Sequence, residues 1–239
     1  MNTSDSRQVA ILASIVLLLL VSCSAGSSRA NAQAIFDNYV TAIHEGDQST
    51  VDSLESQMRS DAKDMDPVIE KSLSSPDPDK RKAACYAVHI TMDPNACEAL
   101  LRLAQNESDP AVKLSAIQGL GLARVTSAIP FLKSQVNLPF DQSSFVSLCS
   151  LYKINSEAAV AAFQSRLSGI AGPMDQHGCL CVISMLELIQ KSDPKGNSTF
   201  VLSVLNRLKS CSSEQHYSQL REDAVAKRPP SHLPAGISS

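Results

Sequence analysis

Soft metal ligands gather in one short stretch of this sequence. His177, Cys179 and Cys181 are close neighbours along the chain, and Cys211 and His216 follow in the next segment. Imidazole and thiolate groups are ligands of zinc and copper, so this set could hold a metal ion. A helix, however, places Cys179 and Cys181 about 200° apart around its axis, which is poor geometry for binding one ion. We therefore expect no metal here.

The same helical geometry favours a disulfide bond between Cys179 and Cys211. Each of the two cysteines continues an apolar helical stripe, and a hairpin that turns near residue 195 places them opposite each other. Two alternatives stay open: buried reduced thiols, and a chromophore- or metal-handling module centred on His177–Cys181 and Cys211. For the remaining four cysteines two pairings stay open, Cys85 with Cys97 and Cys149 with Cys181, and small buried apolar side chains are at least as good an interpretation.

Catalytic motifs are missing from the sequence. Its five histidines show no metalloprotease spacing, no serine sits in a nucleophile elbow, and no Gly-rich loop follows a strand. Gly119 and Gly121 lie at a predicted helix end, where they indicate close packing and a helix C-cap. We expect a protein that is not an enzyme and needs no cofactor.

Cys23 is the residue for which the sequence predicts a modification. It follows an apolar run over residues 9–22, which is shorter than the roughly 20 residues of a membrane-spanning helix and is typical of a signal peptide. The run ends in Leu20-Val21-Ser22-Cys23, which resembles the bacterial lipoprotein signal. That resemblance implies that Cys23 is acylated, with palmitate among the acyl chains, and becomes the N-terminus. The alternatives are an ordinary secretory signal and an uncleaved anchor.

A multiply acylated Cys23 would hold the chain at a membrane, because each buried methylene contributes about 0.8 kcal/mol. The localisation that follows is the bacterial cell envelope, with the chain facing the periplasm or the exterior.

The composition favours helices. The 239 residues are 44% hydrophobic and 19% charged, which is enough apolar material for a core. Aromatic residues make up 4%, and there are only 9 glycines, so the apolar content is mostly aliphatic and suits helices better than strands. A formal charge of −3 provides no broad positive field, which argues against nucleic acid as a partner. We expect an all-α fold.

Regularly spaced aspartates indicate stacked repeats. Asp77, Asp109, Asp141 and Asp175 are separated by 32, 32 and 34 residues, and a fixed period of this size is typical of units that complete one another's core. Asp-Pro pairs mark helix starts, because the carboxylate accepts hydrogen bonds from unpaired amides while proline lacks an N–H that would have no partner. The pairs are Asp66-Pro67, Asp77-Pro78, Asp93-Pro94 and Asp109-Pro110. The predicted helices cover residues 66–74, 79–91, 94–106, 110–122, 126–136, 142–154, 156–168, 175–190, 197–211 and 214–226.

The best-preserved unit runs from Asp109 to Val136. It combines an acidic-Pro cap, a basic residue, a small residue and Leu-Gly, and it resembles HEAT repeats of the phycobilisome-lyase-like type. The motif residues are Asp109, Pro110, Lys113, Ala116, Leu120, Gly121, Ala128 and Leu132. The resemblance covers residues 66–212 and implies a short right-handed α-solenoid of about four helical hairpins, used for protein contact. Some members of this type act on chromophores, but nothing else in this sequence supports that chemistry.

These observations predict five segments and a function. The segments are a lipoprotein signal peptide (1–22), a lipidated flexible tether (23–31), an N-terminal helical hairpin cap (32–62), the solenoid (63–226) and a disordered tail (227–239). The predicted function is a membrane-anchored scaffold that binds an unidentified protein or peptide.

Charge is distributed unevenly along the predicted solenoid. Residues 61–110 carry sixteen charged side chains and residues 141–190 carry six. The second stretch is either more tightly buried or an apolar partner-binding surface. The basic run Lys80-Arg81-Lys82 is either an anion site or a solvated helix start.

Overall fold

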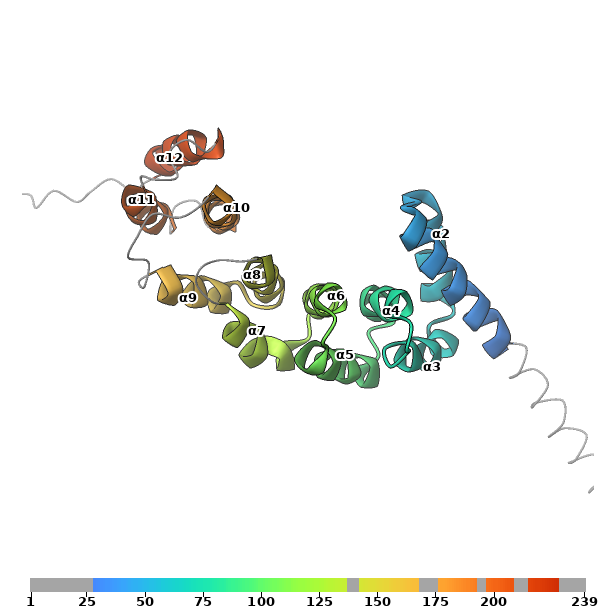
Figure 1. Cartoon of the computed structure of the whole chain (residues 1–239). Helices are drawn as coiled ribbons and strands as arrows, with labels where there is room; N and C mark the ends of the chain where they lie inside the picture. Colours follow the sequence, from blue (N-terminus) through green and yellow to red (C-terminus); the bar gives the residue numbers. More distant parts are fainter. Residues whose placement is uncertain (1–27, 137–141, 168–175, 193–196, 209–214, 228–239) are drawn as a thin grey trace, which may run out of the picture. The chain divides into compact units, whose positions relative to one another are not determined.

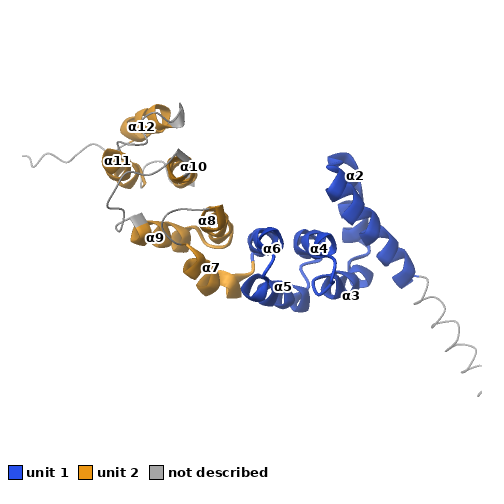
Figure 2. Ribbon diagram, in the orientation of Figure 1, with its two compact units in different colours: residues 1–124 blue, residues 125–239 orange. Residues whose placement is uncertain are grey.

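The computed structural model describes residues 28–136, 142–167, 176–192, 197–208 and 215–227. Every regular element in these residues is helical, which confirms the all-α prediction. The chain divides into two compact units, residues 1–124 and 125–239 (Figure 2). The predicted five-segment organisation remains a prediction, since its signal, tether and tail lie mostly or wholly outside the described residues.

Unit 1 stacks its helices in two layers (Figure 1). Helix α4 packs against α6 in one layer and α3 against α5 in the other, while α5 also contacts α6 and α2 contacts α4. A further helix over residues 28–45 precedes them and forms a hairpin with α2. The bounds are α2 Gln48–Ser60, α3 Ala62–Ser72, α4 Pro78–Thr91, α5 Pro94–Asn106 and α6 Pro110–Leu122.

Unit 2 continues with helix pairs of the same kind. Helix α8 packs against both α7 and α9, and α12 packs against α10 and α11. The bounds are η1 Thr126–Ala128, α7 Ile129–Gln135, α8 Gln142–Ile154, α9 Ser156–Leu167, α10 Gln176–Ser192, α11 Ser198–Arg207 and α12 Gln215–Lys227. Most predicted helices match these bounds to within a few residues.

Three of the four Asp-Pro pairs begin helices as predicted. The Asp77 carboxylate accepts from the Asp79 N–H at 2.9 Å, and Asp93 accepts from the Ala96 N–H at the same distance. Asp109 accepts from two amides, those of Ala111 and Val112. In each helix the proline occupies the start, where its missing N–H leaves no hydrogen bond unmade. Asp141 and Asp175 lie outside the described residues.

The fourth pair, Asp66-Pro67, was predicted to begin a helix, and that prediction is wrong. Helix α3 begins at Ala62, and Pro67 lies inside it. The turn before the proline is already helical, because the Asp61 carbonyl accepts from the amides of Asp64 and Met65. Met65 is fully buried, so core packing holds this turn in place although proline removes one hydrogen bond.

Gly119 explains how closely α4 and α6 approach. A Cβ atom at this position would lie 2.2 Å from the Cys85 carbonyl oxygen, so only glycine fits. The predicted close packing is confirmed, but the predicted C-cap at Gly121 is wrong. Gly121 is a buried residue within α6, the C-cap is Ala123, and the left-handed conformation falls on Arg124 at φ 50°.

Candidate interaction cleft

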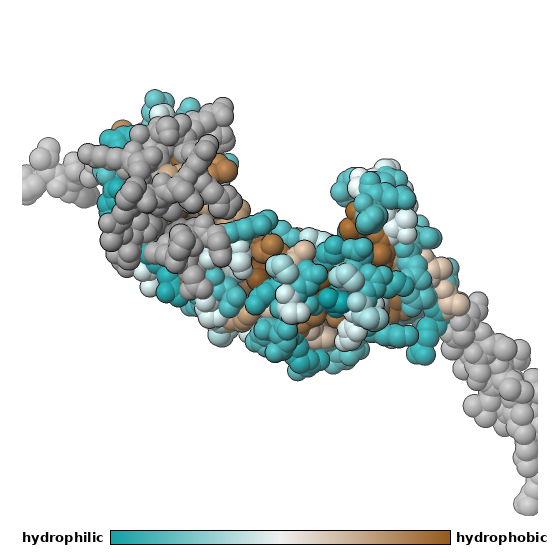
Figure 3. Space-filling model, in the orientation of Figure 1, coloured by the Kyte–Doolittle hydropathy of each residue, from teal (hydrophilic) through white to brown (hydrophobic). Residues whose placement is uncertain are grey.

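A cleft of about 260 Å³ opens in unit 1, between the hairpin of helix 28–45 and α2 on one side and α4 and the end of α6 on the other. We call it the unit 1 cleft. The space-filling view shows apolar surface on the side of this hairpin that is turned toward α4 (Figure 3). The lining residues are Tyr39, Ala42, Ile43, Gly46, Gln48, Val51, Glu55, Tyr86, His89 and Leu122.

Tyr39 and Glu55 form a polar pair in the cleft. The Tyr39 side chain is almost wholly buried, and its hydroxyl donates to Glu55 Oε1 at 3.2 Å. Burial, followed by the negative charge of Glu55, raises the pKa of the Tyr39 phenol far above its usual value. The phenol therefore stays protonated and can only act as a donor to this carboxylate.

Tyr86 and His89 line the opposite wall from α4. The Tyr86 hydroxyl donates to Gln118 Oε1 on α6 at 2.6 Å, which fixes the ring between two successive repeats. His89 Nδ1 donates to the Tyr86 carbonyl oxygen, so its other ring nitrogen is turned away from that bond. Leu122 is 37% exposed and completes an apolar rim with Ile43. The cleft thus combines apolar surface, two phenol rings and one carboxylate.

The three basic side chains at the start of α4 form ion pairs within the chain. Lys80 Nζ lies 2.8 Å from Asp37 Oδ1 and Lys82 Nζ lies 2.6 Å from Asp79 Oδ1. Arg81 pairs with Glu107, with 2.9 Å between Nε and Oε2. All three cations are therefore matched by carboxylates of the chain itself, and the Lys80 pair ties helix 28–45 to α4.

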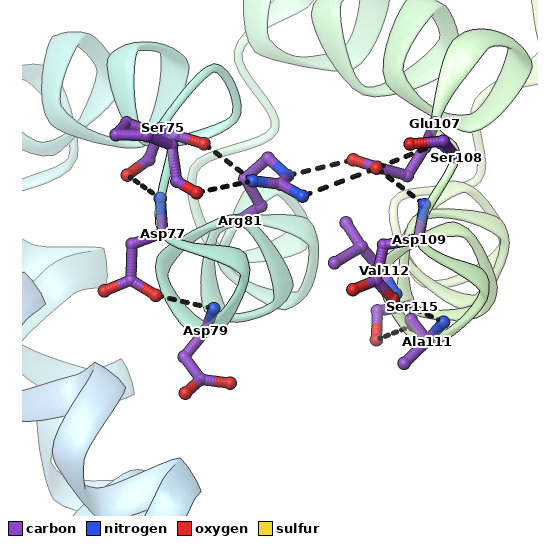
Figure 4. A network of polar contacts seen from close by, with 11 residues as sticks. Ser75, Asp77, Asp79, Arg81, Glu107, Ser108, Asp109, Ala111, Val112 and Ser115 are labelled. Carbon is purple, nitrogen blue, oxygen red and sulfur yellow. Dashed lines mark hydrogen bonds and ion pairs between the residues drawn. The ribbon is translucent and has the colours of Figure 1, made fainter.

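The Arg81–Glu107 pair is the centre of a wider polar network (Figure 4). Arg81 Nη1 also donates to the carbonyl oxygens of Ser75 and Pro76, and Glu107 Oε1 accepts from the amides of Ser108 and Asp109. These contacts join the turn before α4 to the turn before α6. The network is structural, because its groups satisfy one another.

Among the described residues, one cysteine is in a disulfide bond and four carry a thiol. Cys179 is buried and disulfide-bonded. Its predicted partner Cys211 lies outside the described residues, as does the lipidation residue Cys23, so the Cys179–Cys211 pairing and the Cys23 anchor remain predictions. The four thiols are Cys85, Cys97, Cys149 and Cys181. Burial raises the pKa of Cys85 to about 12, which makes it a packing residue with an unreactive thiol.

The predicted metal alternative cannot be assembled from the described residues alone. No group of three or more His, Cys, Asp or Glu side chains among them is arranged to hold a metal ion. The side chains of His177, Cys211 and His216 lie outside this description. In the same part of the chain, no helix has the length and apolarity needed to cross a bilayer.

Burial accounts for the charge-poor stretch 141–190 wherever the structure describes it. Its large apolar side chains are mostly buried, among them Leu148, Leu151, Phe163 and Ile183. Leu180 is the exception, at 52% exposed. Of the two interpretations of this stretch, tight packing is therefore the better supported.

The fold and the comparisons place the chain in a class. Layered helical hairpins that recur with a 32-residue period define an α-solenoid. Residues 45–121 and 65–143 match the family described as HEAT repeats, which supports a HEAT-repeat protein. Comparison with curated proteins and with solved structures gave no match.

No local sequence motif marks the unit 1 cleft. Tyr39 continues the apolar helical spacing of Phe36, Val40 and Ile43, and Glu55 and Tyr86 belong to no predicted site. One signal was available: Tyr86 and Gln118 are separated by 32 residues, the period of the repeat, so their contact could have been inferred from the alignment of the two units.

Proposed function

We propose that this chain is a membrane-anchored scaffold of the bacterial cell envelope that holds a segment of a partner protein in the unit 1 cleft. HEAT repeats support the scaffold part, because stacked helical hairpins offer rigid, extended surfaces for protein contact. The motif Leu20–Cys23 supports the anchor. The motif of Asp109 to Leu132 supports the phycobilisome-lyase-like type of repeat, without implying chemistry on a chromophore.

The observation that carries the proposal is the cleft itself. At about 260 Å³ it is smaller than the roughly 300–1,000 Å³ of typical small-molecule sites, and it suits one or two side chains of a protein partner. Leu122 is exposed at its rim, and Tyr86, which lines it, is of a residue type that is enriched at protein interfaces.

Cell fractionation tests the proposal, because it shows whether a partner moves from one fraction to another together with the chain. In cells producing the wild-type chain, we expect the chain and its crosslinked partner in the membrane fraction, with labelled palmitate incorporated. In a Cys23→Ser variant, both should move together to the soluble fraction of the envelope, because the acceptor thiol is lost. Cys97→Ser is the control, because it changes a cysteine far from the signal motif. Ser22→Thr is unsuitable as a control, because it alters that motif.

Two results would contradict the proposal. If the Cys23→Ser chain stays in the membrane fraction and the wild type incorporates no palmitate, the anchor is wrong. If the partner remains at the membrane when the chain is released, the chain does not determine where that partner lies, and the scaffold role is wrong.

A further inference from the structure

Among the residues that the structure describes, the Glu55 carboxylate has one hydrogen-bond donor and no cation. Tyr39 donates to its Oε1, and within the described residues no Lys, Arg or His lies within ion-pair distance of it. Arg59, one turn further along α2, is exposed and makes no ion pair with it. Other carboxylates around α4 differ from Glu55, because Asp37, Asp79 and Glu107 each form an ion pair with a basic side chain.

This carboxylate is partly buried and lines a cleft whose remaining walls are largely apolar or aromatic. A charge in such a place is less well solvated than one at the surface, and it interacts more strongly with an opposite charge brought beside it. The phenol ring of Tyr86 is half-buried and lines the same cleft, and aromatic faces attract cations. The cleft therefore favours a positive group with an apolar stem.

We infer that the unit 1 cleft receives a Lys or Arg side chain from a segment of a partner protein, with the cationic end at Glu55. The aliphatic stem of that side chain lies against Ile43 and Leu122, and the neighbouring apolar residues of the segment cover the exposed rim. This inference rests on the proposed function and names the chemistry of the partner. Cleft volume, apolar rim and unpaired carboxylate all match a long basic side chain.

Binding of short peptides to the full chain in detergent tests the inference. The probe is a fluorescein-labelled peptide with one arginine flanked by valine and leucine, and its match has citrulline, which has nearly the same shape without the charge. We expect the arginine peptide to bind the wild type about tenfold more tightly than the citrulline peptide, the effect of one charge-assisted hydrogen bond. Fluorescence anisotropy measures both affinities.

Two variants make the test specific. Glu55→Gln should abolish the preference for arginine, whereas Glu45→Gln removes the same charge from an exposed position outside the cleft lining and should leave the preference intact. Circular dichroism verifies that both variants keep the helical content of the wild type.

The inference is overturned if wild type binds the two peptides equally, if it binds neither, or if Glu55→Gln keeps the preference. An equal loss in Glu45→Gln would also overturn it, because the effect would then come from net charge. None of these results bears on whether a partner follows the Cys23→Ser chain, so failure here is distinguishable from failure of the scaffold proposal.

Discussion

Arg81 and Glu107 are 26 residues apart and form an ion pair that joins successive repeats, with 2.9 Å between Nε and Oε2. Their side chains are only 16% and 7% exposed, and both also bind backbone groups of the turns that begin α4 and α6. The pair thus fixes the spacing between two Asp-capped helix starts, at Asp77 and Asp109.

Truncating one member of this pair should destabilise unit 1. Arg81→Ala leaves the buried Glu107 carboxylate without its cation, and we expect a loss of about 3 kcal/mol in the free energy of unfolding. Arg102→Ala is the matched control, because Arg102 pairs with Glu98 on an exposed face and should contribute less than about 0.5 kcal/mol. Urea denaturation followed by circular dichroism measures both. Equal losses would show that the buried position of Arg81 has no special importance.

The same pair should make stability depend on acid pH. Burial alone would raise the pKa of Glu107, but hydrogen bonds from the Asp109 amide and from Arg81 outweigh it and hold the pKa below its usual 4.5. A carboxyl with a lowered pKa in the folded state stabilises the fold above its ordinary pKa, and this contribution is lost as the pH falls. We expect the wild type to lose more stability than Glu107→Gln as the pH is lowered from 4.5. Parallel pH profiles of the two proteins would contradict this.

Substitution of Gly119 tests the contact between α4 and α6. In an open helix, Gly→Ala is stabilising by about 1 kcal/mol, because alanine has the higher helix propensity. At Gly119 the added Cβ would meet the Cys85 carbonyl, so we expect Gly119→Ala to destabilise the protein by about 1–3 kcal/mol. The sign of the change in the thermal midpoint shows whether the gain in helix propensity or the clash with the Cys85 carbonyl is the larger effect. A higher midpoint would mean that α4 and α6 are not in close contact at this point.

The aspartates that begin α4, α5 and α6 show why part of the fold could be predicted. Asp77, Asp93 and Asp109 act on amides two or three residues away, so their role is visible in the sequence around them. The prediction that Asp66-Pro67 begins a helix fails because the turn before Pro67 is already helical. Met65 in that turn is buried in the core. The outcome there depends on tertiary packing, which the local sequence does not show.

The unit 1 cleft could not be predicted from local sequence either, because its residues come from several helices. Tyr39 and Glu55 are on different helices of a hairpin, and Tyr86 and Leu122 come from two later repeats. Each residue is ordinary in its own helix. The packing of the hairpin against α4 makes Glu55 a partly buried carboxylate that pairs with no cation among the described residues.

Cys179 supplies a prediction about redox state. It is disulfide-bonded, and we propose Cys211 as its partner, which would close a loop of about 30 residues. A crosslink of that length should stabilise the folded chain by about 2–4 kcal/mol. A non-reduced proteolytic digest analysed by mass spectrometry should contain the peptides of Cys179 and Cys211 joined, and reduction should lower the thermal midpoint. Detection of Cys179 joined to another cysteine would contradict the pairing.

Position-specific photo-crosslinking shows directly whether the partner binds at the unit 1 cleft. A benzophenone amino acid replaces Leu122 at the cleft rim or, in a second strain, Leu180 in unit 2; both side chains are exposed, at 37% and 52%. We predict that irradiation of intact cells joins the chain to one discrete partner from position 122 and not from position 180. A product from position 180 and none from position 122 would contradict the claim and assign the partner to the charge-poor part of the chain.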